Sequence, residues 1–155
     1  MALMLKIGTL NDLDLVNQLL RLSKAHWGYD QLFMDKFMKE LCVKPYHLEA
    51  GLTTLVFKDN KLIGFYAFIL CDDNALELDY FFLHLDHIGG GLGQEMWDAC
   101  CQTAKAFGKN EFIIWVDPNA ENFYLRMGCK KIGVRKSSMM PNRFPSILEF
   151  KIKRE

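Results

Sequence analysis

The stretch LELDYFFL at residues 76–83, followed by IGGGLGQ at residues 88–94, decides the fold of this chain. In the first part, apolar and polar residues alternate as they do in a strand with one buried face. In the second part, four glycines occupy five positions directly before a segment with the apolar spacing of a helix. The sequence therefore predicts a strand that leads into a glycine-rich loop, and the loop opens a helix.

The glycine-rich loop has the properties of an anion site. N–H groups at the start of a helix lack an intrahelical acceptor, and the helix dipole adds partial positive charge there. Glycines let the main chain approach a phosphate closely. Gly93-Gln94-Glu95 lacks the Lys and Ser/Thr of a Walker loop, and the spacing is not that of a dinucleotide fingerprint. A plain turn without a ligand is the alternative that the residues leave open.

The remaining elements follow from apolar spacing and turn residues. In the first half of the chain we predict a strand at Leu5–Ile7, a helix after a capping box at Thr9–Asp12, a helix at Asp30–Leu41, and a hairpin of Thr53–Phe57 and Leu62–Leu70 around the turn Lys58–Lys61. A strand at Leu76–Leu83 and a helix from Leu92 to near Gly108 follow. The last elements are a buried strand at Phe112–Val116, a helix with Asn119 as its N-cap and Gly128 after its end, and strands at Lys130–Val134 and Ser146–Lys151. This order predicts a mixed α/β (α+β) fold, and the absence of repeats and linkers predicts one domain, residues 1–155.

Composition excludes several classes of function. The formal net charge is zero, so no strong field favours a nucleic acid or an anionic membrane as partner. The N-terminus lacks the features of a signal peptide, and no apolar run approaches the roughly 20 residues of a spanning helix. The five cysteines form no CxxC pair, which indicates a reduced, cytoplasmic chain without a disulfide framework or metal site.

A second motif, NAENFYLRMGC at residues 119–129, lies one predicted helix and one predicted strand after the glycine loop. With both motifs in this order, the chain resembles the GNAT superfamily of N-acetyltransferases. The central family motif is Gln/Arg-x-x-Gly-x-Gly/Ala, and IGGGLG at residues 88–93 departs from it because Ile88 replaces Gln or Arg. The second family motif often reads Asn, then Phe-Tyr, then Gly-Phe, as in Asn119, Phe123-Tyr124 and Gly128-Cys129 here.

This resemblance implies a GNAT-like fold, with a mixed, mostly antiparallel central sheet flanked by helices, and acetyl-CoA as co-substrate. The main chain of Phe81 to Leu83 would pair with the pantetheine arm like an added strand. The amides from Gly89 to Gln94 would hold the pyrophosphate, and Asn119 would lie near the pantetheine or its thioester. The implied cofactor-binding residues are Phe81, Phe82, Leu83, Gly89, Gly90, Gly91, Leu92, Gly93, Gln94 and Asn119.

The reaction implied by the resemblance needs a base and an acid. An alkyl ammonium has a pKa of about 10, so a proton must leave the amine before it attacks. Glu77 is the preferred base and Asp79, on the same strand face, is the second candidate; either could instead hold the substrate ammonium. Tyr124 would protonate the departing thiolate, and a core aromatic beside Phe123 is its structural alternative. We expect direct transfer without an acetyl-enzyme.

Neither motif identifies the acceptor of the acetyl group. We expect the amine of a small molecule; the alternatives are a peptide or protein amine, or a non-catalytic acyl-CoA-binding module. In the GNAT fold the first two helices and the last loop wall the acceptor site. The candidate residues for the acceptor site are therefore Trp27, Tyr29, Phe33, Ser137, Arg143 and Phe144. The loop Ser137–Pro145 resembles a Ser…Pro-x-Arg…Pro pattern of some small family members, in which Arg143 could either bind a substrate carboxylate or brace the loop. Family members often pair through their late strands, so a homodimer of this kind is a further candidate.

Overall fold

The computed structural model describes residues 3–135 and 145–152, whose seven strands belong to one sheet. The strands are β1 (Met4–Ile7), β2 (Thr53–Lys58), β3 (Lys61–Leu70), β4 (Leu76–Leu83), β5 (Glu111–Val116), β6 (Lys130–Val134) and β7 (Ser146–Lys151). Their order is β1-β2-β3-β4-β5-β7-β6. β4 and β5 pair in parallel, whereas β1–β2, β2–β3, β5–β7 and β6–β7 are antiparallel. The predicted mixed, mostly antiparallel sheet is confirmed.

Five α-helices and two short 3-10 helices connect the strands of the described chain. They are α1 (Leu13–Ala25), α2 (Gln31–Leu41), α3 (Pro45–Glu49), α4 (Leu92–Ala106), α5 (Glu121–Arg126), η1 (Leu10–Asp12) and η2 (Leu85–His87). The four longer helices occur in the predicted order, and α3 was not predicted because one turn of helix shows no apolar period. No helix within residues 3–135 and 145–152 is both long and apolar enough to cross a membrane.

The chain forms two compact units, each described by itself. Unit 1 comprises Met1–Phe68 and Tyr80–Met96, and unit 2 comprises Ile69–Asp79 and Trp97–Glu155. β4 and α4 are continuous elements that contribute residues to both units. The single domain expected from the sequence stays a prediction.

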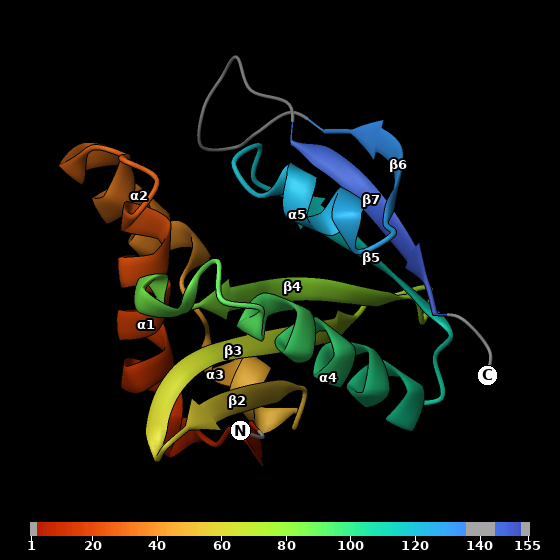
Figure 1. The fold of residues 1–155 in the computed structure, drawn as a ribbon, viewed down its shortest axis with the longest axis horizontal. Coiled ribbons are helices and arrows are strands. Elements are labelled where there is room, and N and C mark those ends of the chain that lie inside the picture. Colours follow the sequence, from red (N-terminus) through yellow and green to blue (C-terminus); the bar gives the residue numbers. More distant parts are fainter. Residues whose placement is uncertain (1–2, 136–144, 153–155) are drawn as a thin grey trace. The chain divides into compact units, whose positions relative to one another are not determined.

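In unit 1, β2 and β3 form an antiparallel hairpin and lie side by side in Figure 1. Its loop has two residues, Asp59 and Asn60, both in the left-handed region with φ of 51° and 65°. This conformation matches the twist of the adjoining strands, and Asp and Asn tolerate it better than other side-chain-bearing residues. The turn is thus shorter than the predicted Lys58–Lys61, because both lysines belong to the strands.

Polar side chains fix the helices of unit 1. The Asp12 carboxylate accepts hydrogen bonds from the Thr9 N–H at 2.9 Å and from the Thr9 hydroxyl at 3.3 Å, as the predicted capping box requires. The N–H bond is the main reason why the pKa of Asp12 is lowered. Asn17 of α1 bonds both the N–H and the carbonyl of Val43, at 2.7 and 3.0 Å. These bonds tie α1 to the chain that follows α2.

Gly64 of β3 lies where main chain and side chains of unit 1 come close together. An ideal Cβ on Gly64 would be 2.8 Å from the Phe82 carbonyl oxygen, 2.8 Å from Met96 Sδ and 3.5 Å from Leu83 Cα. Any larger residue would therefore push β3 away from the end of β4 and the start of α4. Glycine at this position sets the spacing of three elements.

An aromatic cluster forms the core of unit 2. The indole of Trp97 has ring-centroid distances of 5.6 Å to Phe112, 5.1 Å to Phe150 and 5.8 Å to Tyr124. The continuous apolar run of β5 predicted a buried strand, but burial in the structure alternates along it, and only one face is buried. Trp115 on the other face is 40% exposed, with the Arg135 guanidinium 3.8 Å from its ring centroid.

Candidate active site

The glycine loop of unit 1 has the conformation that an anion site at a helix start needs. Gly89 and Gly91 have φ of 90° and 84°, which side-chain-bearing residues rarely adopt. Gly90 has no positive φ in the structure, and a Cβ built on any of the three glycines would meet no other part of the chain within 4 Å. The loop is therefore open on its outer side, and the 15-residue helix α4 begins directly after it.

Main-chain direction at the end of β4 follows from two contacts with β3. The Phe82 carbonyl oxygen lies beside β3, and the His84 N–H donates to the Ile63 carbonyl at 2.6 Å. Because successive residues of a strand direct their main-chain groups to opposite sides, Phe81 and Leu83 direct theirs away from β3. Of the three residues predicted to pair with pantetheine, these two have the suitable direction and Phe82 does not.

Glu77 and Asp79 share one face of β4, as predicted from the alternation of the strand. Glu77 is half-buried and pairs with Ile113 of β5, whereas Asp79 is exposed. Burial raises the pKa of the Glu77 carboxyl, the Asp79 carboxylate raises it further, and the Arg135 guanidinium opposes both. A carboxyl with a raised pKa is a stronger base than an ordinary glutamate, which suits a proton acceptor near neutral pH.

Tyr124 is the one buried residue of α5 and is 7% exposed. Its ring packs against the Trp97 ring, and the Cys129 N–H caps the helix by donating to the Tyr124 carbonyl at 3.1 Å. Burial is the main cause of a raised pKa of the phenol, so the hydroxyl keeps its proton at neutral pH. These contacts fit a core aromatic and a proton donor equally well.

The predicted helix cap at Asn119 is wrong. α5 begins at Glu121 with Ala120 at the cap position. Asn119 lies in the preceding turn, where its N–H donates to the Asp117 carboxylate at 2.8 Å, and the Ala120 N–H donates to the Asp117 carbonyl at 2.8 Å. Asp117 thus forms the turn that the sequence had assigned to Asn119. The Asn119 side chain is exposed.

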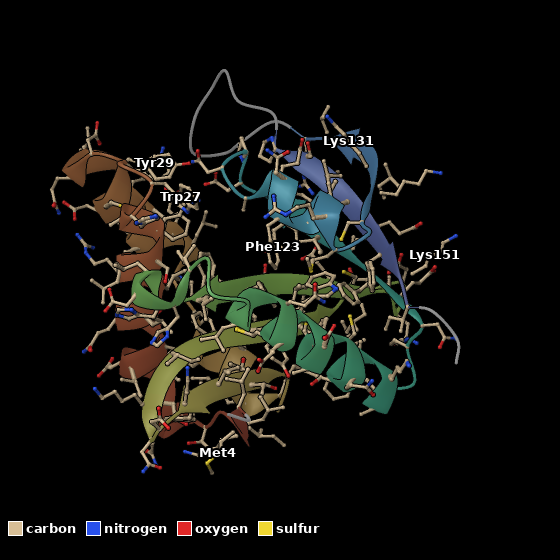
Figure 2. The ribbon with its side chains drawn as sticks, in the orientation of Figure 1. Met4, Trp27, Tyr29, Phe123, Lys131 and Lys151 are labelled. Atoms are coloured by element: carbon tan, nitrogen blue, oxygen red, sulfur yellow. The ribbon has the colours of Figure 1, made fainter. Side chains whose placement is uncertain are left out.

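The predicted residues are distributed over both units. Unit 1 contains the strand end and loop, Phe81 to Gln94, and unit 2 contains Glu77, Asp79, Asn119 and Tyr124. Of the predicted acceptor residues, Trp27 and Tyr29 lie between α1 and α2 (Figure 2), and Tyr29 stacks on Phe33 with ring centroids 4.2 Å apart. The others, Ser137, Arg143 and Phe144, lie outside the described residues, as does the predicted loop Ser137–Pro145 apart from its last residue.

Sequence reasoning missed two residues that act on the predicted site, one through a hydrogen bond and one through its charge. The hydroxyl of Ser23, on α1, donates to the Leu83 carbonyl at 3.1 Å. Arg135 lies close enough to Glu77 to lower its pKa. In the sequence, Ser23 is marked only by its helical spacing from Leu19 and Leu20, which is a weak signal. Arg135 is 58 residues from Glu77 along the chain, so no local pattern connects the two.

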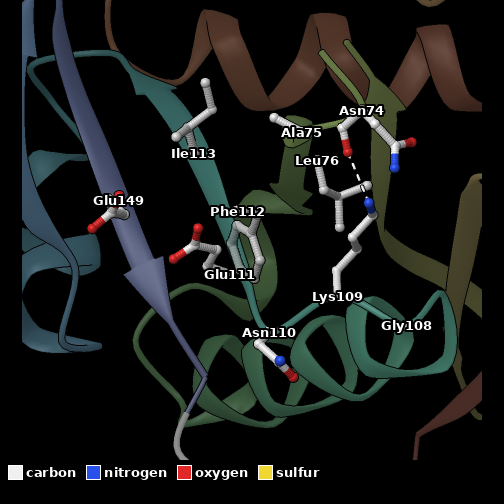
Figure 3. Close-up of a pocket in the computed structure, with 10 residues that line it drawn as sticks. All are labelled: Asn74, Ala75, Leu76, Gly108, Lys109, Asn110, Glu111, Phe112, Ile113 and Glu149. Atoms are coloured by element: carbon white, nitrogen blue, oxygen red, sulfur yellow. Dashed lines mark hydrogen bonds between the residues drawn. The ribbon is translucent and has the colours of Figure 1, made fainter. Parts of the chain in front are cut away.

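A pocket of about 460 Å³ in unit 2 contains none of the predicted site residues (Figure 3). It lies at the beginning of β4 and β5 and is lined by Leu76, Phe112, Glu111 and neighbours. The Lys109 ammonium, at one side, donates to the Asn74 carbonyl at 2.8 Å. Within residues 3–135 and 145–152, no group of three or more His, Cys, Asp or Glu side chains could hold a metal ion.

Comparison with solved structures shows that the fold is shared widely. PaiA N-acetyltransferase of Thermoplasma acidophilum, in complex with coenzyme A, is 19% identical over 97% of this chain and 99% of its own, with a TM-score of 0.76. Ard1 of Thermoplasma volcanium is 11% identical, covering 99% and 100%, with a TM-score of 0.72. YncA of Salmonella typhimurium, with its cofactor acetyl-CoA, is 14% identical, covering 100% and 96%, with a TM-score of 0.68. No curated protein sequence matches the chain.

A family profile identifies the chain more specifically than these structures do. Residues 15–129 match the acetyltransferase (GNAT) family, and this match includes β4, the glycine loop, α4 and the motif around Tyr124. The resemblance inferred from the two motifs is confirmed, together with the enzyme class and acetyl-CoA as co-substrate. The chain belongs to the acetyltransferase (GNAT) family.

Proposed function

We propose that this acetyltransferase moves the acetyl group of acetyl-CoA directly to the amine of a small-molecule acceptor. The observation that carries the proposal is the open glycine loop between β4 and the long helix α4. Gly89 and Gly91 need to be glycine for their φ values, but neither φ nor a neighbouring atom requires glycine at position 90. A ligand that approaches the main chain closely would explain why position 90 is glycine, because a side chain there would block the approach.

Two parts of unit 1 would hold acetyl-CoA. The N–H groups from Gly89 to Gln94 would bind the pyrophosphate, since a helix start binds anions without basic side chains. The main-chain groups of Phe81 and Leu83, directed away from β3, would pair with the pantetheine arm. Asn119, which belongs to unit 2, stays a cofactor-binding candidate on the resemblance alone.

The residues of unit 2 would handle the protons. Acetyl-CoA supplies the acetyl group and a thiol leaving group. The Glu77 carboxylate would accept the proton that the attacking amine loses, with Asp79 attracting the ammonium form of the acceptor to the same strand face. The Tyr124 hydroxyl would donate a proton to the sulfur as it leaves. The raised pKa of Glu77 and the protonated state of Tyr124 both support these roles.

Location and assembly are proposed from the cysteines and from the edge of the sheet. The five cysteines are free thiols, and two of them are buried, which favours a reducing compartment such as the cytoplasm. β6 is an edge strand with Ile132 and Val134 more than half exposed, which supports a homodimer through the late strands.

Thermal shift tests the co-substrate part of the proposal. At 100 times its Kd, a ligand stabilises a protein by about 2.7 kcal/mol, which corresponds to roughly 5–10 °C in Tm for a chain of this size. Acetyl-CoA and CoA should give such a shift, and ATP and NAD should not. The wild-type chain showing no shift with either CoA species would exclude the proposed ligand.

A pair of glycine variants locates the binding. Gly91 and Gly108 flank α4, both with positive φ (84° and 77°) and with no atom near an added Cβ. Gly91→Ala and Gly108→Ala should therefore cost similar backbone strain, about 1–2 kcal/mol. Only Gly91→Ala should weaken acetyl-CoA binding. Equal weakening in both variants would place the pyrophosphate elsewhere.

The acceptor requires a panel assay. Small mono- and polyamines are compared with peptides that carry a free N-terminus or a lysine, and released CoA thiol is measured. We expect the highest kcat/KM with a small cationic amine. A preference for the peptides would replace the small-molecule acceptor by a protein one and leave acetyl-CoA unaffected.

A further inference from the structure

The peptide bond between Leu83 and His84 is held on both sides. Its carbonyl oxygen accepts a hydrogen bond from the Ser23 hydroxyl at 3.1 Å, and its N–H donates to the Ile63 carbonyl at 2.6 Å. Ser23 is 4% exposed, so water does not replace this bond easily. All of these groups lie in unit 1. α1 and β3 together therefore fix the point at which β4 ends and the chain turns toward the glycine loop.

Ser23 occupies a position where a helix of this kind normally has an apolar residue. It follows Leu19 and Leu20 on the buried side of α1, four and three residues later. A serine inside a helix usually bonds to a carbonyl one turn back in the same helix. Here its hydroxyl donates to a strand residue 60 positions away.

The direction of this bond connects Ser23 with the co-substrate. Leu83 directs its main-chain groups away from β3, and the Ser23 hydroxyl approaches from that side. This is the edge that would pair with pantetheine. Ser23 thus takes one acceptor position of the Leu83 carbonyl, on the side of β4 that faces away from β3.

We infer that Ser23 is a positioning residue for acetyl-CoA: its hydroxyl holds the end of β4 in the conformation that pairs with the pantetheine arm. The inference rests on the proposed function. A strand edge that is already ordered does not lose conformational freedom on binding, so affinity is higher than for a loose edge. Ser23 itself contacts no reacting atom, so it should affect binding and leave the chemical step unchanged.

Ser23→Ala tests the inference, with Thr53→Val as a matched control. Thr53 is also fully buried in unit 1, and its hydroxyl donates to the His47 carbonyl at 3.0 Å. Both variants lose one buried bond from a hydroxyl to a main-chain carbonyl. We expect Ser23→Ala to raise the Kd and KM for acetyl-CoA by about three- to tenfold, the range of one hydrogen bond. The kcat value and the KM for the amine should not change, and Thr53→Val should keep the wild-type affinity.

Amide hydrogen exchange supplies a readout that does not depend on the ligand. In Ser23→Ala the His84 N–H should exchange faster than in wild type, and in Thr53→Val it should not. Wild-type affinity in Ser23→Ala, or an equal loss in both variants, would overturn the positioning role alone. A wild-type chain that binds no CoA would overturn the proposed function and the positioning role with it.

Discussion

Replacing Gly64 by alanine should destabilise the protein, although alanine is normally the more favourable residue. An exposed strand glycine costs about 0.5–1 kcal/mol relative to alanine because of its freedom in the unfolded chain. At Gly64, however, the added Cβ would lie 2.8 Å from both the Phe82 carbonyl oxygen and Met96 Sδ. The Met96 side chain can rotate, but the Phe82 carbonyl belongs to β4, so the strands must separate.

The expected cost follows from that contact. Insertion of one methyl into a tightly packed region costs about 1–3 kcal/mol, which lowers Tm by roughly 3–10 °C in a chain of this length. Gly133→Ala is the control, because Gly133 is also a strand glycine and its Cβ would meet nothing within 4 Å. Gly133→Ala should keep or raise Tm.

Thermal denaturation followed by circular dichroism measures both variants. Acetyl-CoA affinity should also fall in Gly64→Ala, because the displaced Phe82 lies next to Phe81 and Leu83. A Tm of Gly64→Ala at or above that of Gly133→Ala would refute the argument that glycine at position 64 sets the spacing of β3 and β4.

Other predictions concern the titratable residues. Burial raises the pKa of Glu77, so the folded chain binds this proton more tightly than the unfolded chain does, and ionisation costs stability. Glu77→Gln should therefore raise Tm at pH 7 while lowering kcat, and the gain in Tm should disappear below about pH 4; a loss of Tm at pH 7 would contradict this. Arg135→Gln should move the acid limb of the pH–kcat profile to higher pH, because the guanidinium lowers the Glu77 pKa; an unmoved limb would exclude Glu77 as the base. Tyr124→Phe keeps the ring contact with Trp97 but should lower kcat roughly 100-fold with little change in Tm, whereas a core role alone would leave kcat intact. Burial raises the pKa values of Cys101 and Cys129 to about 12 each, so mass spectrometry should find both thiols slow to react with iodoacetamide at pH 8 until urea is added.

The sequence predicted most elements because their signals are local. The strand predicted from the alternation in residues 76–83 has the same bounds as β4 in the structure, and the predicted bounds of β6 and β7 also agree with the structure. Helix ends were predicted well where glycine adopts a positive φ, as at Gly108 and Gly128.

The errors occurred where the outcome depends on distant parts of the chain. β5 was predicted to be buried because its residues are apolar, yet the Trp115 side chain is 40% exposed. Its ring contacts the Arg135 guanidinium, which lies over one face. Leu41 continues the apolar spacing of Phe33 and Phe37 in α2, yet it is 39% exposed, whereas Met34 of the same helix is buried. No local pattern shows which side of an apolar element finds a partner.

The roles of the candidate site residues stay predictions, and the structure adds what surrounds them. Glu77 and Tyr124 have environments that suit a base and an acid. The main-chain directions of Phe81 and Leu83, and the contact from Ser23, depend on pairing with β3 and packing of α1. Such contacts join residues 20 to 60 positions apart and become visible only in the folded chain.

The central claim is that the chain transfers acetyl from acetyl-CoA to an amine, and one assay tests it directly. The purified protein is incubated with acetyl-CoA and the amine panel, and mass spectrometry detects acetylated products while released CoA is measured in the same sample. The account predicts at least one acetylated amine, formed in amounts equal to the CoA released and abolished by omitting the protein. CoA release that does not depend on any amine, or no acetylated product from small amines or peptides, would contradict it.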